Sequence, residues 1–276
     1  MRDRAPVTRQ WDSSALAEGW DLVLPPSRPS ARQLVLVTDA LTAIDRQSPV
    51  GVLGSTPELR DLLFELGFVD VYVFDKNPTF HEAMTEQRVH RSRETLVEGD
   101  WLDTIGQSGG VFGALLSDLT MGNVPYARRS AFYAGVASAL RRGGVFYDKV
   151  LTHPIPHLSL EPLLRKYDTL PTNWLHVNEF SCEVLFCSEL LNLSLEVDTT
   201  RFYEILSVAT SSPRIRTFCD RAKRITPPAC RWCYGRPWHE LEPDYCPQLG
   251  RVATHDDEVG SPYYRRVKHF VLVRGQ

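Results

Sequence analysis

Residues suited to binding a nucleoside fall where the predicted strands of this chain end. Gly54, Asp75, Asp100 and Asp118 each stand at the end of a short apolar run and just before a turn. The carboxyl ends of parallel strands meet at one edge of a sheet, and open α/β sheets bind their ligands at that edge. A glycine there lets a ligand approach the backbone, and carboxylates there accept hydrogen bonds from hydroxyl and amino groups.

The segment VGVLGSTPE (50–58) is the most informative of these strand ends. Small and apolar residues up to Leu53 are typical of a parallel strand that is covered on both faces. Gly54 permits a tight turn, and Thr56 can cap the following helix, with Pro57 at its first position. The turn has one glycine, whereas a dinucleotide fingerprint has three, partly to accommodate a pyrophosphate. The segment therefore predicts a ligand without phosphate groups.

Two acidic residues extend this interpretation. Asp75 lies about 20 residues after Gly54, at the end of the second predicted strand, where a carboxylate can accept hydrogen bonds from ribose hydroxyls. Asp100 is followed by Trp101, so a carboxylate for an exocyclic amine stands beside a ring that can stack on adenine. The alternatives are that Asp75 caps the helix beginning near Asn77, and that Asp100 caps a turn while Trp101 is part of the core. A phosphate-free nucleoside bound by a ribose acid and an adenine acid describes S-adenosylmethionine.

The elements that position these residues alternate regularly along the chain. The predicted strands cover 50–54, 69–75, 95–100, 112–118 and 144–151, and the predicted helices cover 57–66, 78–88 and 127–141, with a shorter turn near 101–106. Strands alternating with helices indicate right-handed crossovers and a parallel sheet. One further strand is expected at 265–274.

Six segments together resemble the class I S-adenosylmethionine-dependent methyltransferases. They are VGVLGSTPE (50–58), VYVFDKN (71–77), EGDWLD (98–103), ALLSDLTMGNVP (114–125), LRRGGVFYDKVL (140–151) and RRVKHFVLVR (265–274). The resemblance implies a doubly wound, mostly parallel Rossmann-like α/β sheet with an antiparallel last strand and a large C-terminal cap insertion. It implies S-adenosyl-L-methionine as cofactor, and contact with it by Gly54, Ser55, Thr56, Asp75, Lys76, Asp100, Trp101 and Asp118. The glycine turn departs from the family, which usually has two or three glycines and an acidic residue there.

The same reading divides the chain into four parts. These are an N-terminal helical and loop cap (1–48) with a helix at 33–44, a cofactor-binding core (49–152), a substrate-recognition insertion (153–262), and the returning last strand (263–276). The insertion is expected to have helices near 159–168 and 178–209, the second of them either continuous or broken. The N-terminal part and the insertion are expected to cover the carboxyl edge of the sheet and to shape the substrate site.

Three residues are candidates for the catalytic step. Lys149 and Asp118 partly match the SDxxP…KV motif of RNA ribose 2′-O-methyltransferases, which favours a lysine beside an acid. Successive strand residues face opposite sides, so Asp148 and Lys149 cannot share a face. His153 follows the fifth predicted strand, and a histidine is suited to act as a base near neutral pH. The alternatives are a solvated lysine and an exposed loop histidine.

The C-terminal cysteines raise the question of a metal. Cys230 and Cys233 form one CxxC pair, and Cys246 with a nearby histidine could complete a tetrahedral zinc site. A usual double pair is absent, so free thiols are favoured and no metal is predicted.

Composition narrows the class of protein. The chain has 276 residues, six cysteines and a formal net charge of −3, which give no overall signal for binding polyanions. No segment approaches the roughly 20 uninterrupted apolar residues of a membrane span, and residues 1–14 lack the apolar core of a secretory signal. We therefore expect a cytoplasmic protein with reduced thiols and no membrane partner.

The expected function is methyl transfer to an oxygen or nitrogen of a small-molecule acceptor, in secondary metabolism such as natural-product biosynthesis. One alternative is an RNA (ribose 2′-O) or protein methyltransferase, for which Arg128, Arg129, Arg141 and Arg142 could supply a basic stripe. Another is a non-catalytic protein that binds S-adenosylmethionine or another nucleoside.

Overall fold

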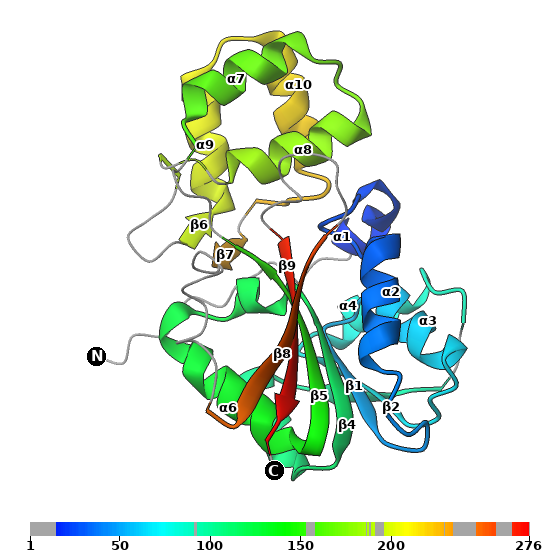
Figure 1. Ribbon diagram of the computed structural model, residues 1–276. Helices are drawn as coiled ribbons and strands as arrows, with labels where there is room; N and C mark the ends of the chain where they lie inside the picture. Colours follow the sequence, from blue (N-terminus) through cyan, green and yellow to red (C-terminus); the bar gives the residue numbers. More distant parts are fainter. Residues whose placement is uncertain are drawn as a thin grey trace. The chain divides into compact units, whose positions relative to one another are not determined.

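The computed structural model describes residues 15–90, 93–152, 158–185, 187, 189–190, 196–228, 230–233, 247–257 and 267–275. The chain divides into two compact units (Figure 1). One unit combines Met1–Leu24 with Pro154–Cys233, and the other combines Pro25–His153 with Tyr234–Gln276. The second unit contains a seven-stranded sheet, so we call it the sheet unit and call the other the helical unit.

The order of strands in the sheet is β3-β2-β1-β4-β5-β9-β8. Their bounds are β1 (Val50–Leu53), β2 (Val71–Asp75), β3 (Thr95–Glu98), β4 (Phe112–Asp118), β5 (Leu140–Leu151), β8 (Leu249–Asp256) and β9 (Val267–Arg274). The first five strands pair in parallel, β9 is antiparallel to β5, and β8 is antiparallel to β9. The prediction of a doubly wound, mostly parallel sheet with an antiparallel last strand is confirmed.

Helices cover both faces of this sheet (Figure 1). On one face lie α2 (Ala31–Ala40), α3 (Pro57–Glu65) and α4 (Pro78–Thr85), and on the other lies α6 (Arg129–Ala139). Trp101 and Leu102 of the short α5 (Trp101–Thr104) pack against the same apolar cluster as α6. The predicted helix at 33–44 begins earlier, because the Ser30 hydroxyl caps α2 by accepting a hydrogen bond from the Gln33 amide at 3.0 Å.

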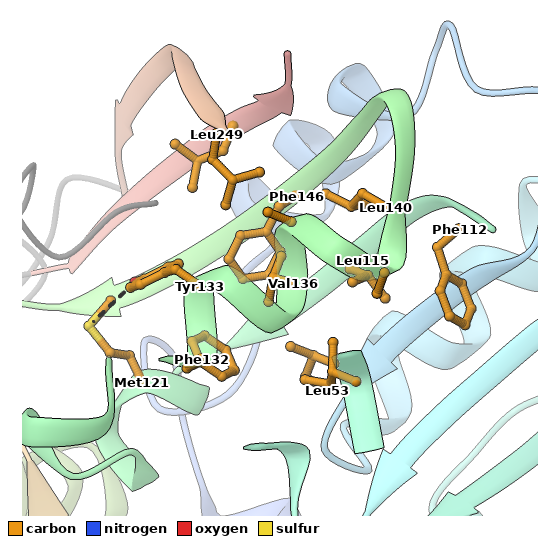
Figure 2. Close-up of a cluster of buried hydrophobic side chains, with 14 of the residues drawn as sticks. Leu53, Phe112, Leu115, Met121, Phe132, Tyr133, Val136, Leu140, Phe146 and Leu249 are labelled. Atoms are coloured by element: carbon orange, nitrogen blue, oxygen red, sulfur yellow. Dashed lines mark hydrogen bonds between the residues drawn. The ribbon is translucent and has the colours of Figure 1, made fainter. Parts of the chain in front are cut away.

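The apolar layer between the sheet and α6 shows how burial holds this face together. Leu53, Leu115 and Phe146 on the strands pack against Phe132 and Val136 of α6 (Figure 2). The rings of Phe132 and Phe146 meet edge to face with centroids 6.3 Å apart. Truncating one such phenylalanine to alanine typically costs about 3–5 kcal/mol, so this layer fixes the helix on the sheet.

The sheet departs from the prediction mainly at the start of β5 and at β8, a strand that was not predicted. β5 begins at Leu140 rather than at residue 144, and its register with β4 jumps from Phe112↔Leu140 to Ala114↔Val145. The intervening residues bulge from the ladder around Gly143, whose φ of +72° favours glycine. β8 lies within 153–262, the range predicted as an insertion, and its pairing with β9 corrects that range: the chain has returned to the sheet by residue 249.

The predicted N-terminal cap also needs correction. Residues from Pro25 onward belong to the sheet unit, whereas the residues before them belong to the helical unit. Leu36, Val37 and Leu41 are buried against the sheet, so α2 is a layer of the core rather than part of a separate cap.

The helical unit is built from α7 (Leu160–Thr169), α8 (Trp174–Val184), α9 (Thr199–Ala209), α10 (Pro213–Ala222), the short α1 (Ala15–Glu18) and the pair β6 (Glu196–Asp198) and β7 (Arg231–Cys233). Tyr167, Phe180 and Phe218 form its aromatic core, with ring centroids 5.1–5.4 Å apart. The predicted helix at 178–209 is two helices separated by β6, and the sequence analysis missed α10.

A buried group of charged residues lies behind the turn that joins β1 to α3. The Arg60 side chain has no solvent exposure, and its Nε donates to Glu94 Oε2 at 3.1 Å. Glu94 also accepts from Arg88 Nη1 at 2.9 Å, and Arg88 Nε donates to Asp61 at 2.9 Å. We call these four residues the Arg60 network. A buried charge that loses its partner is strongly destabilising, so the network holds α3, the end of α4 and the start of β3 together.

Glu94→Gln keeps the shape of the side chain but removes the charge that two buried arginines share. We expect the free energy of unfolding to fall by about 3 kcal/mol, measured by urea titration. Glu65→Gln is the control, since Glu65 is 55% exposed in its pair with His90, and we expect it to change stability by less than about 0.5 kcal/mol. Equal stability of the two variants would contradict this role of Glu94.

Candidate functional site

The backbone of the turn after β1 is held from two directions. Leu53 O accepts a hydrogen bond from the Thr120 hydroxyl at 3.0 Å, and Gly54 N donates to Phe74 O at 2.9 Å. Gly54 has a φ of +93°, which L side chains rarely adopt, so the glycine at this position is required by the backbone. The turn is thus tied to β2 on one side and to the segment after β4 on the other.

The next two residues of the turn are tied down as well. Ser55 O accepts from Arg60 Nη1 at 3.2 Å, and the Ser55 hydroxyl donates to Asp75 Oδ2 at 2.6 Å. Thr56 precedes α3 but makes no side-chain cap, which corrects the predicted capping role. Its hydroxyl instead lies 3.5 Å from Asp118 Oδ2, so the turn contacts the ends of both β2 and β4.

Asp75 is held in one orientation at the end of β2. Its Oδ1 accepts from the Asn77 amide at 3.0 Å, and its Oδ2 accepts from Ser55. Burial raises the pKa of Asp75, and these two hydrogen bonds oppose that rise. Asn77 is the residue that caps α4, by accepting from the Phe80 amide, so the interpretation of Asp75 as a helix cap is wrong.

Asp100 and Trp101 have separate local roles. Asp100 is exposed, and its Oδ1 accepts from the Leu102 amide at 2.9 Å, so the predicted alternative of a cap holds for this residue. The Trp101 indole N–H donates to Phe74 O at 2.7 Å. A Cβ atom on Gly54 would lie 3.8 Å from the Trp101 ring, so the ring stands beside the turn. Lys76 follows Asp75 and is exposed.

Two of the three candidate catalytic residues meet in the structure. Lys149 Nζ lies 2.8 Å from Asp118 Oδ1, and their side chains are 0% and 3% exposed. Gln33 Nε2 donates to the same Asp118 oxygen at 3.2 Å, and Lys149 Nζ donates to Arg28 O at 3.5 Å. The segment before α2 therefore lies over the ends of β4 and β5. The third candidate, His153, lies outside the described residues.

A second polar chain lies beside this pair and was missed by the sequence analysis. The Tyr147 hydroxyl is 2.6 Å from His269 Nδ1, and His269 Nε2 is 3.4 Å from Asp257 Oδ2. Ser30 donates to Asp257 Oδ1 at 2.8 Å. Burial lowers the pKa of His269, against the opposing effect of Asp257, and burial raises the pKa of Tyr147, so neutral forms of both are favoured. The alternation of β5, which puts Tyr147 on the face of Lys149, was the available signal.

Asp148 lies on the opposite face of β5, as its position next to Lys149 predicted. It is fully buried and accepts from the Tyr133 hydroxyl at 2.9 Å. Burial raises its pKa to about 7, and the hydrogen bond from Tyr133 opposes the rise. Its position on the α6 side separates it from Asp118 and Lys149.

Two alternatives from the sequence, a basic stripe and a zinc site, do not form a site among the described residues. Arg129, one of the four arginines proposed for a basic stripe, is fully buried, with its guanidinium 4.3 Å from the centre of the Tyr126 ring. Within the described part of the chain, no group of three His, Cys, Asp or Glu residues could hold a metal ion. Cys230 is buried there, but Cys246 and the side chain of Cys233 lie outside it. No helix among the described residues is both long and apolar enough to span a membrane.

The chain was compared with known families, curated proteins and solved structures. No family model and no curated protein matches it. Solved structures match at low identity. A protein named as a putative zinc-dependent alcohol dehydrogenase from Rhodobacter sphaeroides is 16% identical with a TM-score of 0.57, over 95% of this chain and 98% of that chain.

Two methyltransferases match over similar lengths. The CcbJ methyltransferase from Streptomyces caelestis is 15% identical with a TM-score of 0.57, over 98% of this chain and 99% of that chain. The N-methyltransferase NodS from Bradyrhizobium japonicum, in complex with S-adenosyl-L-homocysteine, is 9% identical with a TM-score of 0.52, over 96% of this chain and 100% of that chain. Together with the strand order, these likenesses establish a Rossmann-like fold.

The buried Asp148 carboxyl makes stability depend on pH. The native protein holds the Asp148 proton up to about pH 7, whereas the unfolded chain releases it near the ordinary value of 3.8. The stabilisation from this group is therefore complete below about pH 4 and is lost as the pH rises towards about 7, at up to ~1.4 kcal/mol per pH unit. Asp148→Asn removes the titration and keeps an acceptor for Tyr133. We expect the stability of this variant, relative to the wild type, to increase with pH over this range in urea titrations; a constant difference would contradict the raised pKa.

Proposed function

We propose that this chain is an S-adenosylmethionine-dependent methyltransferase that acts on an oxygen or nitrogen of a small molecule. The observation that carries the proposal is the carboxylate of Asp75, fixed at the end of β2 beside a turn with a single glycine. A carboxylate at this place suits ribose hydroxyls, and the turn lacks the further glycines that a pyrophosphate requires. The same feature argues against carrying over the alcohol dehydrogenase name of one structural neighbour.

The residues around the turn fit an adenosyl group. Each carboxylate oxygen of Asp75 has one protein donor, which leaves acceptor capacity on both oxygens for a pair of ribose hydroxyls. The Trp101 ring stands beside Gly54 and offers a flat apolar surface near the adenine position. Asp100 is exposed next to it and keeps a carboxylate oxygen for an exocyclic amine.

The bound cofactor would supply a methyl group made electrophilic by a positively charged sulfur. The chain's own contribution is to bind and orient the reactants and to exclude water from between them. Asp118 and Lys149 form a buried ion pair, so their part would be to hold the ends of β4 and β5 and the segment before α2 in place beside the bound acceptor. A separate base such as His153 is required only when the acceptor carries a proton at neutral pH.

Two observations favour a small-molecule acceptor over RNA. Burial of Arg129 removes one of the four arginines that a basic stripe would need. A methyltransferase from Burkholderia thailandensis with bound 1,6-didemethyltoxoflavin and S-adenosylhomocysteine matches 95% of this chain with a TM-score of 0.50, which favours a small-molecule acceptor. The partial motif around Asp118 and Lys149 still favours the ribose 2′-O alternative, for which RNA binding is the discriminating measurement.

Asp75→Ala should weaken binding of S-adenosylhomocysteine at least about tenfold, because it removes hydrogen bonds to a charged group worth roughly 1.5–3 kcal/mol. Isothermal titration calorimetry measures this directly. Asp103→Ala is the matched control, because Asp103 is 71% exposed in the same region. We expect this variant to bind S-adenosylhomocysteine with the affinity of the wild type.

Two results would contradict the proposal at different levels. Absence of binding to S-adenosylmethionine and S-adenosylhomocysteine at millimolar concentration would reject the methyltransferase function and the non-catalytic binding alternative together. Binding by the wild type that Asp75→Ala leaves unchanged would reject only the placement of the ribose.

A further inference from the structure

We infer that Ser55 and His81 are positioning residues that fix the carboxylate of Asp75 in the orientation needed to bind ribose. This inference rests on the proposed function, because it concerns the ribose end of the same site. It assigns His81, which the sequence analysis did not single out, to the binding apparatus. It also changes the role of Ser55 from a direct cofactor contact to a support for Asp75.

The three residues form a continuous hydrogen-bonded chain from three different elements. The Ser55 hydroxyl, in the turn after β1, lies 2.6 Å from Asp75 Oδ2 at the end of β2. The same hydroxyl oxygen lies 3.3 Å from His81 Nδ1 on α4. Ser55 and Asp75 are 3% and 5% exposed, so the hydrogen bond between them is shielded from water.

The positions of the protons follow from the donors available. A serine hydroxyl has one proton, and an ionised Asp75 can only accept, so Ser55 donates to Asp75. The serine oxygen then accepts from His81, which must carry its proton on Nδ1. Burial and the nearby Arg60 lower the pKa of His81 to about 4, which keeps the ring neutral and able to adopt this tautomer.

The Arg60 network fixes the backbone around this chain. Arg60 donates to Ser55 O at 3.2 Å and to the Thr85 hydroxyl at 2.6 Å. The Thr85 hydroxyl in turn donates to His81 O at 2.8 Å. The same buried guanidinium therefore holds the backbone of Ser55 and, through Thr85, the turn of α4 that carries His81.

These hydrogen bonds restrict rotation of the Asp75 carboxylate. Asn77 N binds Oδ1 and Ser55 binds Oδ2, so rotation of the carboxylate breaks at least one bond. Two fixed oxygens match two adjacent hydroxyls of a ribose, and ligand groups that are already oriented bind with less loss of entropy. The Ser55 hydroxyl thus holds the ribose-binding carboxylate of Asp75 in a turn that has fewer glycines than the family usually has.

The test compares two ligands that differ only at the ribose hydroxyls, S-adenosylhomocysteine and its 2′,3′-dideoxy analogue. Calorimetry gives the dissociation constant of each ligand, and the ratio of interest is that of the dideoxy analogue divided by that of S-adenosylhomocysteine. For the wild type we expect this ratio to be at least about ten. Ser55→Ala and His81→Leu should lower this ratio by about threefold or more, because the Asp75 carboxylate then loses its fixed orientation. A merely structural role would weaken both ligands equally and leave the ratio unchanged.

Two further variants serve as controls. His81→Asn places an amide N–H near the position of the ring Nδ1, so we expect it to retain the wild-type ratio. His90→Asn removes an exposed histidine that pairs with Glu65 at 3.1 Å, and it should leave both affinities unchanged. Thermal melting of each variant checks that it is folded at the temperature of the titration.

The outcomes separate this inference from the proposed function. A ratio that stays at the wild-type value in both Ser55→Ala and His81→Leu overturns the inference while binding of S-adenosylhomocysteine stands. A wild-type ratio near one also overturns it, since Asp75 then does not bind the ribose. Absence of wild-type binding overturns both.

Discussion

The Arg60 guanidinium is completely buried, and the turn between β1 and α3 depends on how that charge is paired. An arginine offers only donors, so each N–H group needs an acceptor inside the protein. Glu94, the Thr85 hydroxyl and Ser55 O provide them, and they belong to three separate segments. Because an uncompensated buried charge costs several kcal/mol, these segments cannot separate while the protein stays folded. The position of the turn is thus coupled to the stability of the whole edge of the sheet.

That coupling gives a turn with one glycine a fixed shape. Side chains from β2, α3, α4 and the end of β4 all contact Ser55 or Thr56, and those of β2 and α4 meet at the Ser55 hydroxyl. Thr56 also links the turn to Asp118, whose partner Lys149 lies beneath the segment before α2. The ribose end and the acceptor end of the proposed site are therefore parts of one connected set of buried polar groups. Methyl transfer depends on alignment within such a site more than on acid–base chemistry, so rigidity of this kind suits the proposed reaction.

The sequence predicted the sheet and the ends of its strands well, because buried parallel strands appear as short apolar runs that stop at turn residues. The same reasoning failed where a pattern was weak or contacts were distant. β8 was missed because most of its side chains are at least partly exposed, which leaves no apolar run. Tyr147 and His269 are separated by 122 residues, and no local pattern connects them. Arg60 lies among the leucines of α3 and has the appearance of a solvated residue, so its partners follow only from the packing of α3 against α4.

On the proposed function, Asp75 and the turn at Gly54 form a preformed site for the adenosyl group of S-adenosylmethionine. The decisive measurement is a crystal structure of the protein with S-adenosylhomocysteine. We expect both ribose hydroxyls within hydrogen-bonding distance of the Asp75 carboxylate, the adenine beside Trp101, and the contacts of Ser55 with Asp75 and Arg60 unchanged. A ligand bound away from Asp75, or a turn that must release Ser55 to admit it, would contradict the claim.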